Sequence, residues 1–281
     1  FSVVIPTFNR QYVLRDTLKS IFGQTYSNWE LFIVDDGSTD DTRSAVKESR
    51  LQDDRIQLIE QKNSGASAAR NNGWKHAKND FVVYVDSDDP VYPNFLSVIA
   101  SSIEKNPACM YGIANHLRKI VLVDGGNNIL QEKEVYNAHG GKSVALQDFY
   151  YWNVKTTSTG LFHKKDMGLG FAWDESLGYI EDWELLLQFG ARYPEGFLHV
   201  SDPLFTYIQK YGTDGMCSRA TYGDWANAFE HIYNKHKDDP FMKGQSWYPE
   251  RVEKYRALQA QYERGEILSA VYKYFPDYQT A

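Results

Sequence analysis

The chain has 281 residues, a formal net charge of -7, and a composition that is 42% hydrophobic and 15% aromatic. This length allows one large domain, or a domain with a helical extension, around a sizeable core. The negative charge argues against a general nucleic-acid binder, which normally carries a basic stripe. Cys109 and Cys217 stand in unrelated contexts, so a disulfide framework and a Cys-based metal site are excluded and a reducing compartment is indicated. Because no apolar run reaches transmembrane length and no signal-peptide pattern is present, we expect a soluble protein.

Strands and helices alternate over about the first hundred residues. Apolar runs predict strands, and apolar residues at helical spacing predict the helices between them. The expected strands are Ser2–Pro6, Leu31–Val34, Ile56–Glu60 and Phe81–Val85, and the expected helices are Tyr12–Phe22, a short helix ending near Arg50, and Ala66–Ala77. This order predicts a parallel sheet with helices on both faces. The chain starts inside a predicted strand without a Met, which favours a trimmed chain or one module of a longer protein.

The pattern is looser after Tyr92. The predicted elements are a helix at Asn94–Glu104, a strand at Ala108–Ala114, a hairpin turn at Asp124–Asn128, an irregular loop at Gln131–Lys142, a strand at Thr156–Phe162, a helix at Ile180–Ala191 and short strands at Phe197–Val200 and Leu204–Ile208. From Tyr222 onward the chain is expected to be helical and aromatic. In its last residues, Val271, Tyr274 and Phe275 could form an apolar face with Tyr278.

Acidic residues follow the fourth predicted strand directly. Asp86, Asp88 and Asp89 lie within four positions, with Ser87 among them. Carboxylates this close together stay ionised only where a cation or several donors neutralise them. Hard oxygen ligands at a strand end suit Mg²⁺ or Mn²⁺ that also holds the phosphates of a substrate. The alternative is an acidic turn that simply ends the strand.

Polar clusters also follow the other three predicted strands. They are Pro6-Thr7-Phe8-Asn9-Arg10, Asp35-Asp36-Gly37-Ser38 and Gln61-Lys62-Asn63-Ser64. Ligands of such sheets bind outside the carboxyl ends of the strands, so we expect all four clusters to face one cleft. Asp36 and Asn63 carry the acceptor and donor atoms that a nucleoside requires. Their alternative roles are a helix cap and a turn residue.

The chain has neither a Gly-rich dinucleotide fingerprint after its first strand nor a Walker-type loop. Phosphates would therefore have to be held by a metal and a cation. Arg70, on the helix after the third strand, is the best placed cation, and its planar guanidinium suits phosphate oxygens. The alternative is a solvated helix residue.

A second acidic feature, Glu181-Asp182-Trp183, lies at the start of a predicted helix. A transfer with inversion needs one carboxylate that takes the proton from an acceptor hydroxyl, and it needs no covalent nucleophile. Asp182 could be that base, and the ring of Trp183 could pack against a sugar. Glu181 could instead be a partner of the helix dipole.

Other aromatic residues are weaker candidates. His163 follows an apolar strand and could face an acceptor, although a structural role is the alternative. His116, His139 and His199 have no metal-like spacing. Trp152 and Trp173 could shape an acceptor site or belong to the core.

Six segments together resemble glycosyltransferase family 2. In the family's order they are Val4–Asn9, Ser20–Glu30, Val34–Thr42, Asn63–Asn71, Asp86–Asp89 and Glu181–Trp183, and the match covers roughly residues 1–210. The resemblance implies an α/β GT-A fold, in which a Rossmann-like, mostly parallel sheet is flanked by helices. We expect a catalytic domain at 1–215, with a nucleotide-binding half at 1–105 and an acceptor-binding half at 106–215, and a C-terminal helical extension at 216–281.

The resemblance also assigns roles to residues. Asp182 would be the general base, and Asp88 of the DXD motif would bind Mn²⁺ or Mg²⁺. The residues implied in binding the nucleotide-sugar, usually a UDP-sugar, are Pro6, Thr7, Asn9, Asp36, Asn63, Arg70, Asp86, Ser87 and Asp89. Glu181, Trp183 and His163 are the candidates on the acceptor side.

The implied reaction is an inverting transfer of one sugar to a hydroxyl of a glycan or lipid-linked acceptor, as in polysaccharide biosynthesis. The expected location is cytoplasmic, at the inner face of the membrane if the C-terminal helices make peripheral contact there; those helices could also self-associate. Where many relatives have Arg-x-His, this chain has Tyr207–Tyr211, so a third protein ligand to the metal stays open and Lys210 could meet the diphosphate. The Gln-x-x-Arg-Trp signature of processive polymerases is missing. The alternatives are a sugar-phosphate nucleotidyltransferase and a catalytically silent carbohydrate-binding module.

Overall fold

The computed structural model describes residues 1–50, 53–124, 128–150, 156–168, 170–211, 220–239, 242–244 and 246–265. It divides into two compact units, which are described separately below. The first unit comprises Phe1–Leu117 and Asn137–Thr206, and the second comprises Arg118–Tyr136 and Tyr207–Ala281. Trp152, Cys217 and the apolar positions near the end of the chain lie outside the described residues.

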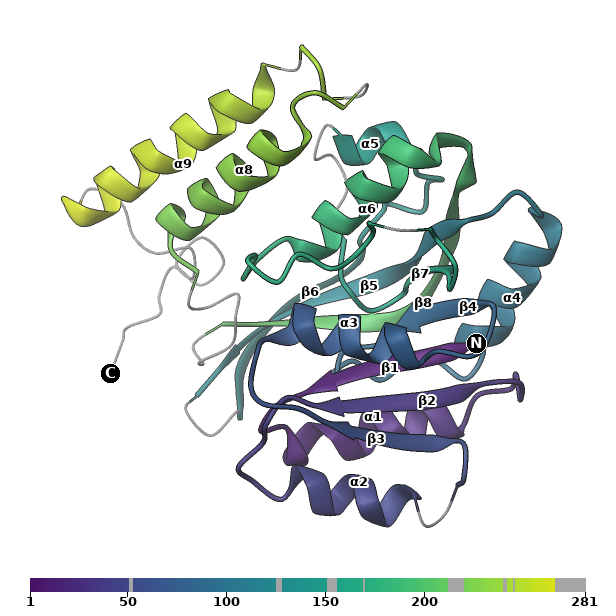
Figure 1. Cartoon of the computed structure of the whole chain (residues 1–281). Helices are drawn as coiled ribbons and strands as arrows, with labels where there is room; N and C mark the ends of the chain where they lie inside the picture. Colours follow the sequence, from purple (N-terminus) through teal and green to yellow (C-terminus); the bar gives the residue numbers. More distant parts are fainter. Residues whose placement is uncertain are drawn as a thin grey trace. The chain divides into compact units, whose positions relative to one another are not determined.

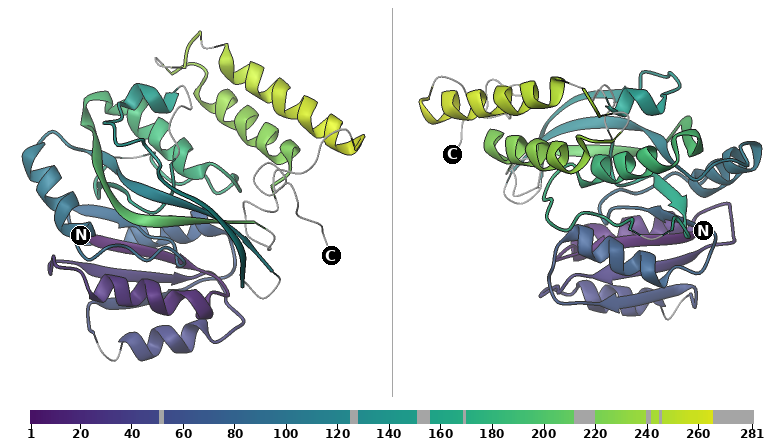
Figure 2. Two further views of the ribbon diagram at one scale, coloured as in Figure 1. Left: turned by 180° about the vertical axis from the view of Figure 1, so that it is seen from behind. Right: turned by 45° about the horizontal axis from the view of Figure 1, so that its top comes forward.

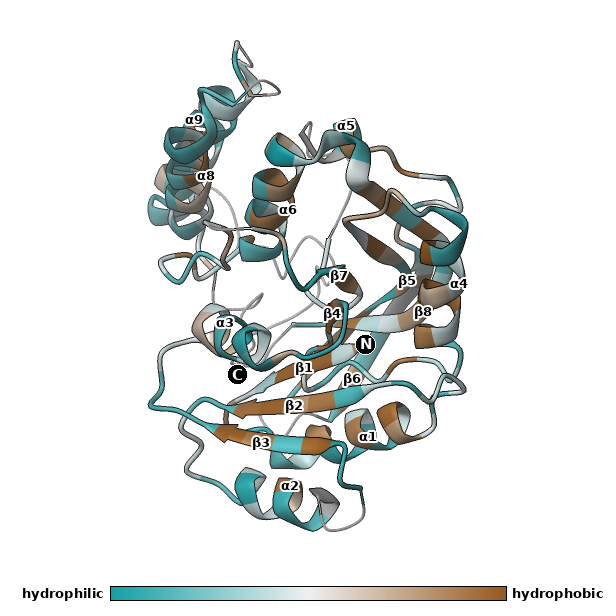
Figure 3. Cartoon of the chain, turned by 45° about the vertical axis from the view of Figure 1, so that its right-hand side comes forward, coloured by the Kyte–Doolittle hydropathy of each residue, from teal (hydrophilic) through white to brown (hydrophobic). Residues whose placement is uncertain are grey.

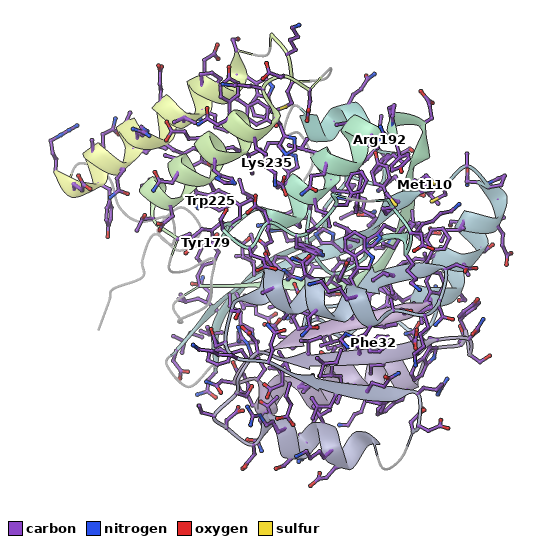
Figure 4. The ribbon with its side chains drawn as sticks, viewed as in Figure 1. Phe32, Met110, Tyr179, Arg192, Trp225 and Lys235 are labelled. Carbon is purple, nitrogen blue, oxygen red and sulfur yellow. The ribbon has the colours of Figure 1, made fainter. Side chains whose placement is uncertain are left out.

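A parallel sheet forms the first part of the first unit. Its strands are β1 (Ser2–Thr7), β2 (Glu30–Asp35), β3 (Ile56–Glu60) and β4 (Phe81–Tyr84), in the order β3-β2-β1-β4. β1 pairs in parallel with β2 and β4, and β2 pairs in parallel with β3. The residues of β1 are buried throughout, as in a sheet covered on both faces. In Figure 3 the hydropathy colouring marks hydrophobic residues along these strands, and Phe32 marks β2 in Figure 4.

Helices cover both faces of this sheet. α1 (Gln11–Phe22) and α2 (Thr42–Arg50) lie on one face, and α3 (Ala66–His76) lies on the other (Figure 1). Right-handed crossover connections explain this placement of the helices. The chain crosses the sheet in one direction from β1 through β2 to β3, and it returns in the opposite direction from β3 to β4, so α3 lies on the other face. Gly73 lets α3 approach β1, since a Cβ atom there would lie 2.4 Å from a methyl carbon of Val4. The predicted parallel sheet and its helices are confirmed.

Antiparallel strands follow. The elements are α4 (Phe95–Lys105), β5 (Tyr111–Val123), β6 (Ile129–Asn137), α5 (Leu146–Tyr150), β7 (Leu161–Lys164), α6 (Glu181–Arg192), a 3-10 turn (Pro194–Gly196) and β8 (Phe197–Tyr211). β7 pairs antiparallel with both β4 and β5, β6 lies at the edge beyond β5, and β8 also pairs with β5. The sheet is therefore mixed, with β7 joining its parallel and antiparallel parts.

Some elements of this part differ from the sequence-based expectations. The irregular loop expected at 131–142 is largely the edge strand β6, whose charged residues hide the alternation of a strand. The two short strands expected after Gly196 form one long strand, β8, although it contains Pro203. Residues 156–160 are not part of β7, which begins at Leu161. The short helix α5 was not predicted.

α6 lies beside α3 on one face of the sheet. The ring of Trp74, on α3, lies 4.1 Å from the ring of His163 and 6.3 Å from that of Phe189, on α6. The indole N–H of Trp74 donates to the backbone oxygen of Lys165 at 2.9 Å. This aromatic packing holds the C-terminal half of α6, through Phe189, against α3 and β7.

In the second unit, α8 (Tyr222–His236) and α9 (Trp247–Glu263) form a helical hairpin (Figure 2). The rings of Phe229 and Tyr255 stack between the two helices at 5.6 Å. Thr221 caps α8, because its side chain accepts a hydrogen bond from the backbone N–H of Asp224. The predicted C-terminal helices are present, but the unit also includes β6 and the ends of β5 and β8. Among the described residues, no helix combines the length and the apolar character that crossing a bilayer requires.

Candidate active site

The loops after β1 and β2 are joined by Asn9. Its backbone is left-handed (φ 52°), and its side-chain oxygen accepts from the backbone N–H groups of Thr39 at 2.7 Å and Asp40 at 3.4 Å. Its own N–H donates to the Ser38 hydroxyl at 2.9 Å. Asn9 therefore uses its acceptor oxygen to align two strand-end loops, a role distinct from the nucleoside contact that the sequence suggested.

The loops after β2 and β3 are joined in a similar way by Asp36. Its buried carboxylate accepts from the backbone N–H groups of Ser64 and Gly65, both at 2.8 Å. Gly37 follows in a left-handed conformation (φ 82°), and a Cβ atom there would lie 3.0 Å from the backbone nitrogen of Asn63. Asn63 itself is exposed. Asp36 thus fixes the loop that presents the Asn63 amide to solvent.

The remaining β1 and β4 candidates are largely enclosed. Pro6 lies within β1 opposite Val34 and is buried. The Thr7 hydroxyl is also buried and has no hydrogen-bond partner in the described part of the chain. Ser87 is buried, and its backbone oxygen accepts from the Thr17 hydroxyl of α1 at 2.9 Å.

Thr159 holds the loop Asp86–Asp89 through two hydrogen bonds. The Thr159 hydroxyl accepts from the backbone N–H of Asp86 at 2.9 Å and donates to the Asp89 carboxylate at 2.7 Å. Asp89 is buried, so this contact points to a structural position. Asp88 is different, because its side chain is 33% exposed and its carboxylate lies 4.0 Å from a guanidinium nitrogen of Arg10. Within this loop, Asp88 is thus the carboxylate most open to a ligand.

Arg70 is buried next to the acidic residues of the site. One terminal nitrogen donates to the Asp86 carboxylate at 2.8 Å, and the other donates to the Glu181 carboxylate at 3.0 Å. The guanidinium is 2% exposed and lies 4.6 Å from the ring centroid of Trp173. Burial opposes its charge, but the two carboxylates more than offset this and raise the pKa of Arg70. The expectation that Arg70 faces the phosphates is therefore corrected: it joins the β4 loop to the start of α6.

α6 begins in an unusual backbone conformation. Ile180, the residue before the helix, is left-handed (φ 56°), which a β-branched side chain disfavours. Tyr179 precedes it and is labelled in Figure 4. Glu181, Asp182 and Glu184 in the first turn are all buried. The positive end of the helix dipole favours these acids, and the turn at Ile180 aims this end of the helix toward Arg70.

Asp182 is a buried carboxyl group with a raised pKa. It is 9% exposed. Burial and the neighbouring Glu181 raise its pKa to about 6. The Thr156 side chain, the Trp183 backbone and the charge of Arg70 act in the opposite direction and lower this pKa. A carboxylate with this pKa is mostly ionised at neutral pH and takes up a proton more readily than an ordinary Asp.

Two acceptor candidates are corrected by their burial. His163 is fully buried in β7, where its ring nitrogens contact the Tyr84 hydroxyl at 2.9 Å and the Lys164 backbone oxygen at 2.6 Å. Burial lowers its pKa to about 4, so it is a neutral core residue. Trp183 is also fully buried. Neither side chain is accessible to a sugar. Glu181 contacts Arg70.

Three polar residues near these groups were not predicted from the sequence. Arg10 lies next to Asp88, Thr159 holds both ends of the Asp86–Asp89 loop, and Thr156 contacts Asp182. Arg10 stands in the first strand-end cluster, which was a usable signal. No local pattern distinguishes the two threonines, because their partners lie far away in sequence.

The residues present suit a divalent cation that also binds phosphates. Among the described residues, no three His, Cys, Asp or Glu side chains are grouped to hold a metal alone. Asp88, with an accessible carboxylate, and Asp86, whose side chain is 26% exposed, offer hard oxygen ligands. Mg²⁺ commonly takes one or two carboxylates and completes its shell with water and phosphate. The donor set therefore fits such an ion.

The chain is similar to known proteins in sequence and in structure. Residues 2–163 match the profile of "Glycosyl transferase family 2". The chain is 36% identical over 150 residues to a GalNAc(5)-diNAcBac-PP-undecaprenol beta-1,3-glucosyltransferase of Campylobacter jejuni, covering 53% of this chain and 46% of the relative. It is 34% identical over 138 residues to the Escherichia coli UDP-Glc:alpha-D-GlcNAc-diphosphoundecaprenol beta-1,3-glucosyltransferase WfgD, covering 48% and 53%. The matches thus span about half the length of these two relatives.

Solved structures share the fold. S. aureus TarS residues 1-349, in complex with UDP-GlcNAc, superposes with a TM-score of 0.67 at 17% identity, covering 95% of this chain and 92% of that one. The mannosyltransferase PcManGT from Pyrobaculum calidifontis, in complex with GDP-Man and Mn2+, superposes with a TM-score of 0.56 at 17% identity, covering 96% and 76%. At this identity the likeness concerns the fold, and it confirms the GT-A architecture.

Proposed function

The chain belongs to glycosyltransferase family 2, and from this premise we propose that it is an inverting glycosyltransferase. It moves one sugar from a nucleotide-sugar, a UDP-sugar by preference, to a hydroxyl of a lipid-linked glycan. The observation that carries the proposal is the link from Asp182 through Glu181 and Arg70 to Asp86. This link brings a near-neutral base into one network with the strand-end acids.

The donor's nucleoside end is assigned to the strand-end loops. Asn63 is exposed and offers its amide to the base, and Asp36 and Asn9 hold the surrounding loops in register. The diphosphate is assigned to the neighbourhood of Asp88 and Arg10. Arg10 replaces Arg70 as the phosphate-facing cation in this proposal, because Arg70 is buried and paired while the Arg10 side chain is 36% exposed.

A divalent cation fits beside Asp88 and Asp86 and would neutralise charge on the leaving nucleoside diphosphate. Asp88 would hold it directly, and the Asp86 carboxylate would help while keeping its contact with Arg70. Arg10 adds positive charge on the same side of the loop. Mn²⁺ and Mg²⁺ both suit these oxygen ligands.

The acceptor side is assigned to Asp182. Its carboxylate takes the proton of the acceptor hydroxyl while that oxygen forms a bond to the anomeric carbon, and the bond from this carbon to the phosphate breaks. The electron pair of the broken bond stays with the nucleoside diphosphate. One displacement inverts the configuration, so no covalent nucleophile is required.

The printed names of two relatives support the substrate class. One acts on a PP-undecaprenol glycan and the other on a diphosphoundecaprenol-linked sugar, with UDP-Glc as its donor. A lipid-linked acceptor would bring the protein to the inner face of the membrane, so a peripheral contact belongs to this proposal. The donor sugar itself stays open among hexoses and their N-acetylated forms.

The test is release of free nucleoside diphosphate and of glycosylated product from a panel of UDP-sugars, with and without Mn²⁺. Asp182→Asn keeps the size of the side chain but removes the base. We expect a loss of turnover of at least about 10²-fold, with Mn²⁺-dependent UDP binding close to wild type. Full turnover by Asp182→Asn would disprove the base.

The same assay separates the alternatives. A nucleotidyltransferase would release pyrophosphate from a sugar phosphate and a nucleoside triphosphate and would make no glycosidic bond. A silent module would bind glycan without turnover of any donor. Intact Asp88 and Asp182 in the site favour the glycosyltransferase.

A further inference from the structure

Residues 156–160 run between the two sets of acids that the proposed reaction uses. The segment precedes β7 and has no regular secondary structure, yet Thr159 is buried and Thr156 is half-buried. The Thr159 hydroxyl contacts both ends of the loop that follows β4. Neither threonine was assigned a role by the motifs of the sequence.

Thr159 acts on the β4 loop. Its single hydroxyl accepts from the backbone N–H of Asp86 at 2.9 Å and donates to the carboxylate of Asp89 at 2.7 Å. One oxygen thereby fixes the first and last residues of the loop, and the exposed Asp88 lies between them. Because a hydroxyl has one proton and two lone pairs, both contacts can exist together.

The segment is anchored at its end by Gly160. The Gly160 N–H donates to the Tyr84 backbone oxygen at 3.0 Å, and its own oxygen accepts from the Ala114 N–H at 2.9 Å. Its φ is 84°, and a Cβ atom at this position would lie 3.0 Å from a ring carbon of Phe205, so a larger residue would be strained. The strands on either side, β4 and β5, therefore set the position of Thr159.

We propose that Thr159 is a positioning residue, which sets the geometry of the cation- and diphosphate-binding loop by holding the first and last residues of that loop. The proposal rests on the proposed function. It goes beyond it in assigning the shape of the loop to one hydroxyl group that lies outside it.

The test of Thr159 compares Val, which keeps its shape, with Ser, which keeps its hydroxyl. For Thr159→Val we expect Mn²⁺-dependent UDP binding, measured by calorimetry, to weaken by about 10-fold or more. Thr159→Ser should bind within about twofold of wild type. Equal binding by wild type, Val and Ser variants would overturn this role.

Thr206→Val is the matched control, since its hydroxyl contacts the Tyr92 hydroxyl at 2.8 Å on β8. It deletes the same group without a contact to the Asp86–Asp89 loop and should not change UDP binding. Urea unfolding of all variants shows whether they fold. If the Val variant does not fold, UDP binding is compared among wild type, Thr159→Ser and Thr159→Cys. The thiol of Thr159→Cys is a weaker donor than a hydroxyl, so this variant should bind UDP more weakly than the other two. Loss of turnover in Asp182→Asn together with unchanged Thr159 variants would reject this inference and keep the proposed function.

Discussion

The parallel part of the first unit (residues 1–92) and its antiparallel part (residues 105–117 and 137–206) build the site differently. In the parallel part, Asn9, Asp36 and Asp86 each follow their own strand, so the sheet itself brings them to one edge. In the antiparallel part, Thr159 and Asp182 belong to segments whose positions depend on contacts with distant residues. The first part is positioned by topology, and the second by individual side-chain contacts.

This difference predicts which substitutions change donor binding and which change the base. Changes in the parallel part should alter donor and metal binding, while changes in α6 should alter the ionisation and aim of the base. Thr159 is the exception in the antiparallel part, because its hydroxyl holds the β4 loop and should affect donor binding. Arg70 is the residue that belongs to both, because it joins Asp86 to Glu181. The following experiments test this division, from the largest expected effect on turnover to the smallest.

The largest effect is expected for Asp88→Asn. The substitution removes the accessible carboxylate of the loop, so we expect kcat/KM to fall by at least about 10²-fold and saturation with Mn²⁺ to require more metal. Steady-state kinetics across a Mn²⁺ titration measures this. Asp80→Asn, an exposed position at the other end of β4, is the control and should behave as wild type. Unchanged metal dependence in Asp88→Asn would break the assignment of donor binding to the parallel part.

Arg70→Met should affect both parts. Removing the cation leaves Asp86 and the buried Glu181 without their partner, which costs about 3 kcal/mol of unfolding free energy. Turnover should fall about tenfold or more, because the two acids repel and shift. Urea unfolding and kinetics at one pH report the two effects.

Arg55→Met is the matched control for Arg70. Arg55 also lies over a Trp ring, Trp29, at 3.5 Å and pairs with Asp53 at 2.6 Å, but its side chain is 38% exposed. A surface pair of this kind contributes at most about 1 kcal/mol. Equal losses of stability in the two variants would contradict the importance that we give to burial of Arg70.

Glu181→Gln should shift the pH profile with a smaller change in maximal turnover. Glu181 raises the pKa of Asp182, so its neutralisation should lower that pKa and move the acid limb below about pH 6. The base must be ionised to act, hence activity at about pH 5.5 should rise relative to that at about pH 8. The measurement is kcat against pH, and a limb that moves upward would contradict the assignment of Asp182.

His163→Phe should leave turnover and the KM for the acceptor unchanged. The substitution leaves the buried Tyr84 hydroxyl without its partner, so the free energy of unfolding should fall by about 1–3 kcal/mol. Thermal or urea unfolding measures this. A raised KM for the acceptor with normal stability would show that His163 belongs to the acceptor site.

The same contrast explains what the sequence could predict. β1 to β4 and their helices were placed within a few residues, because apolar runs and helical spacing are local signals. The charged edge strand β6 has no such signal. Asp182 could be nominated from its neighbours and the family's pattern, but the burial of Trp183 and the pairing of Arg70 depend on residues far away in the sequence. Nothing in the local sequence of Thr156 or Thr159 indicates their partners.

The left-handed backbone at Ile180 has a practical consequence for engineering. A β-branched residue in this conformation costs about 1–2 kcal/mol, so Gly or Asn at this position would be an obvious choice in a search for thermostable variants. Such a variant should melt at a higher temperature, provided that the apolar contacts of the buried Ile180 side chain are a smaller loss. It would also give more backbone freedom to the residue immediately before Glu181 and Asp182. Selection for heat resistance alone would therefore tend to trade away activity at this position, and screens of this protein should score both properties.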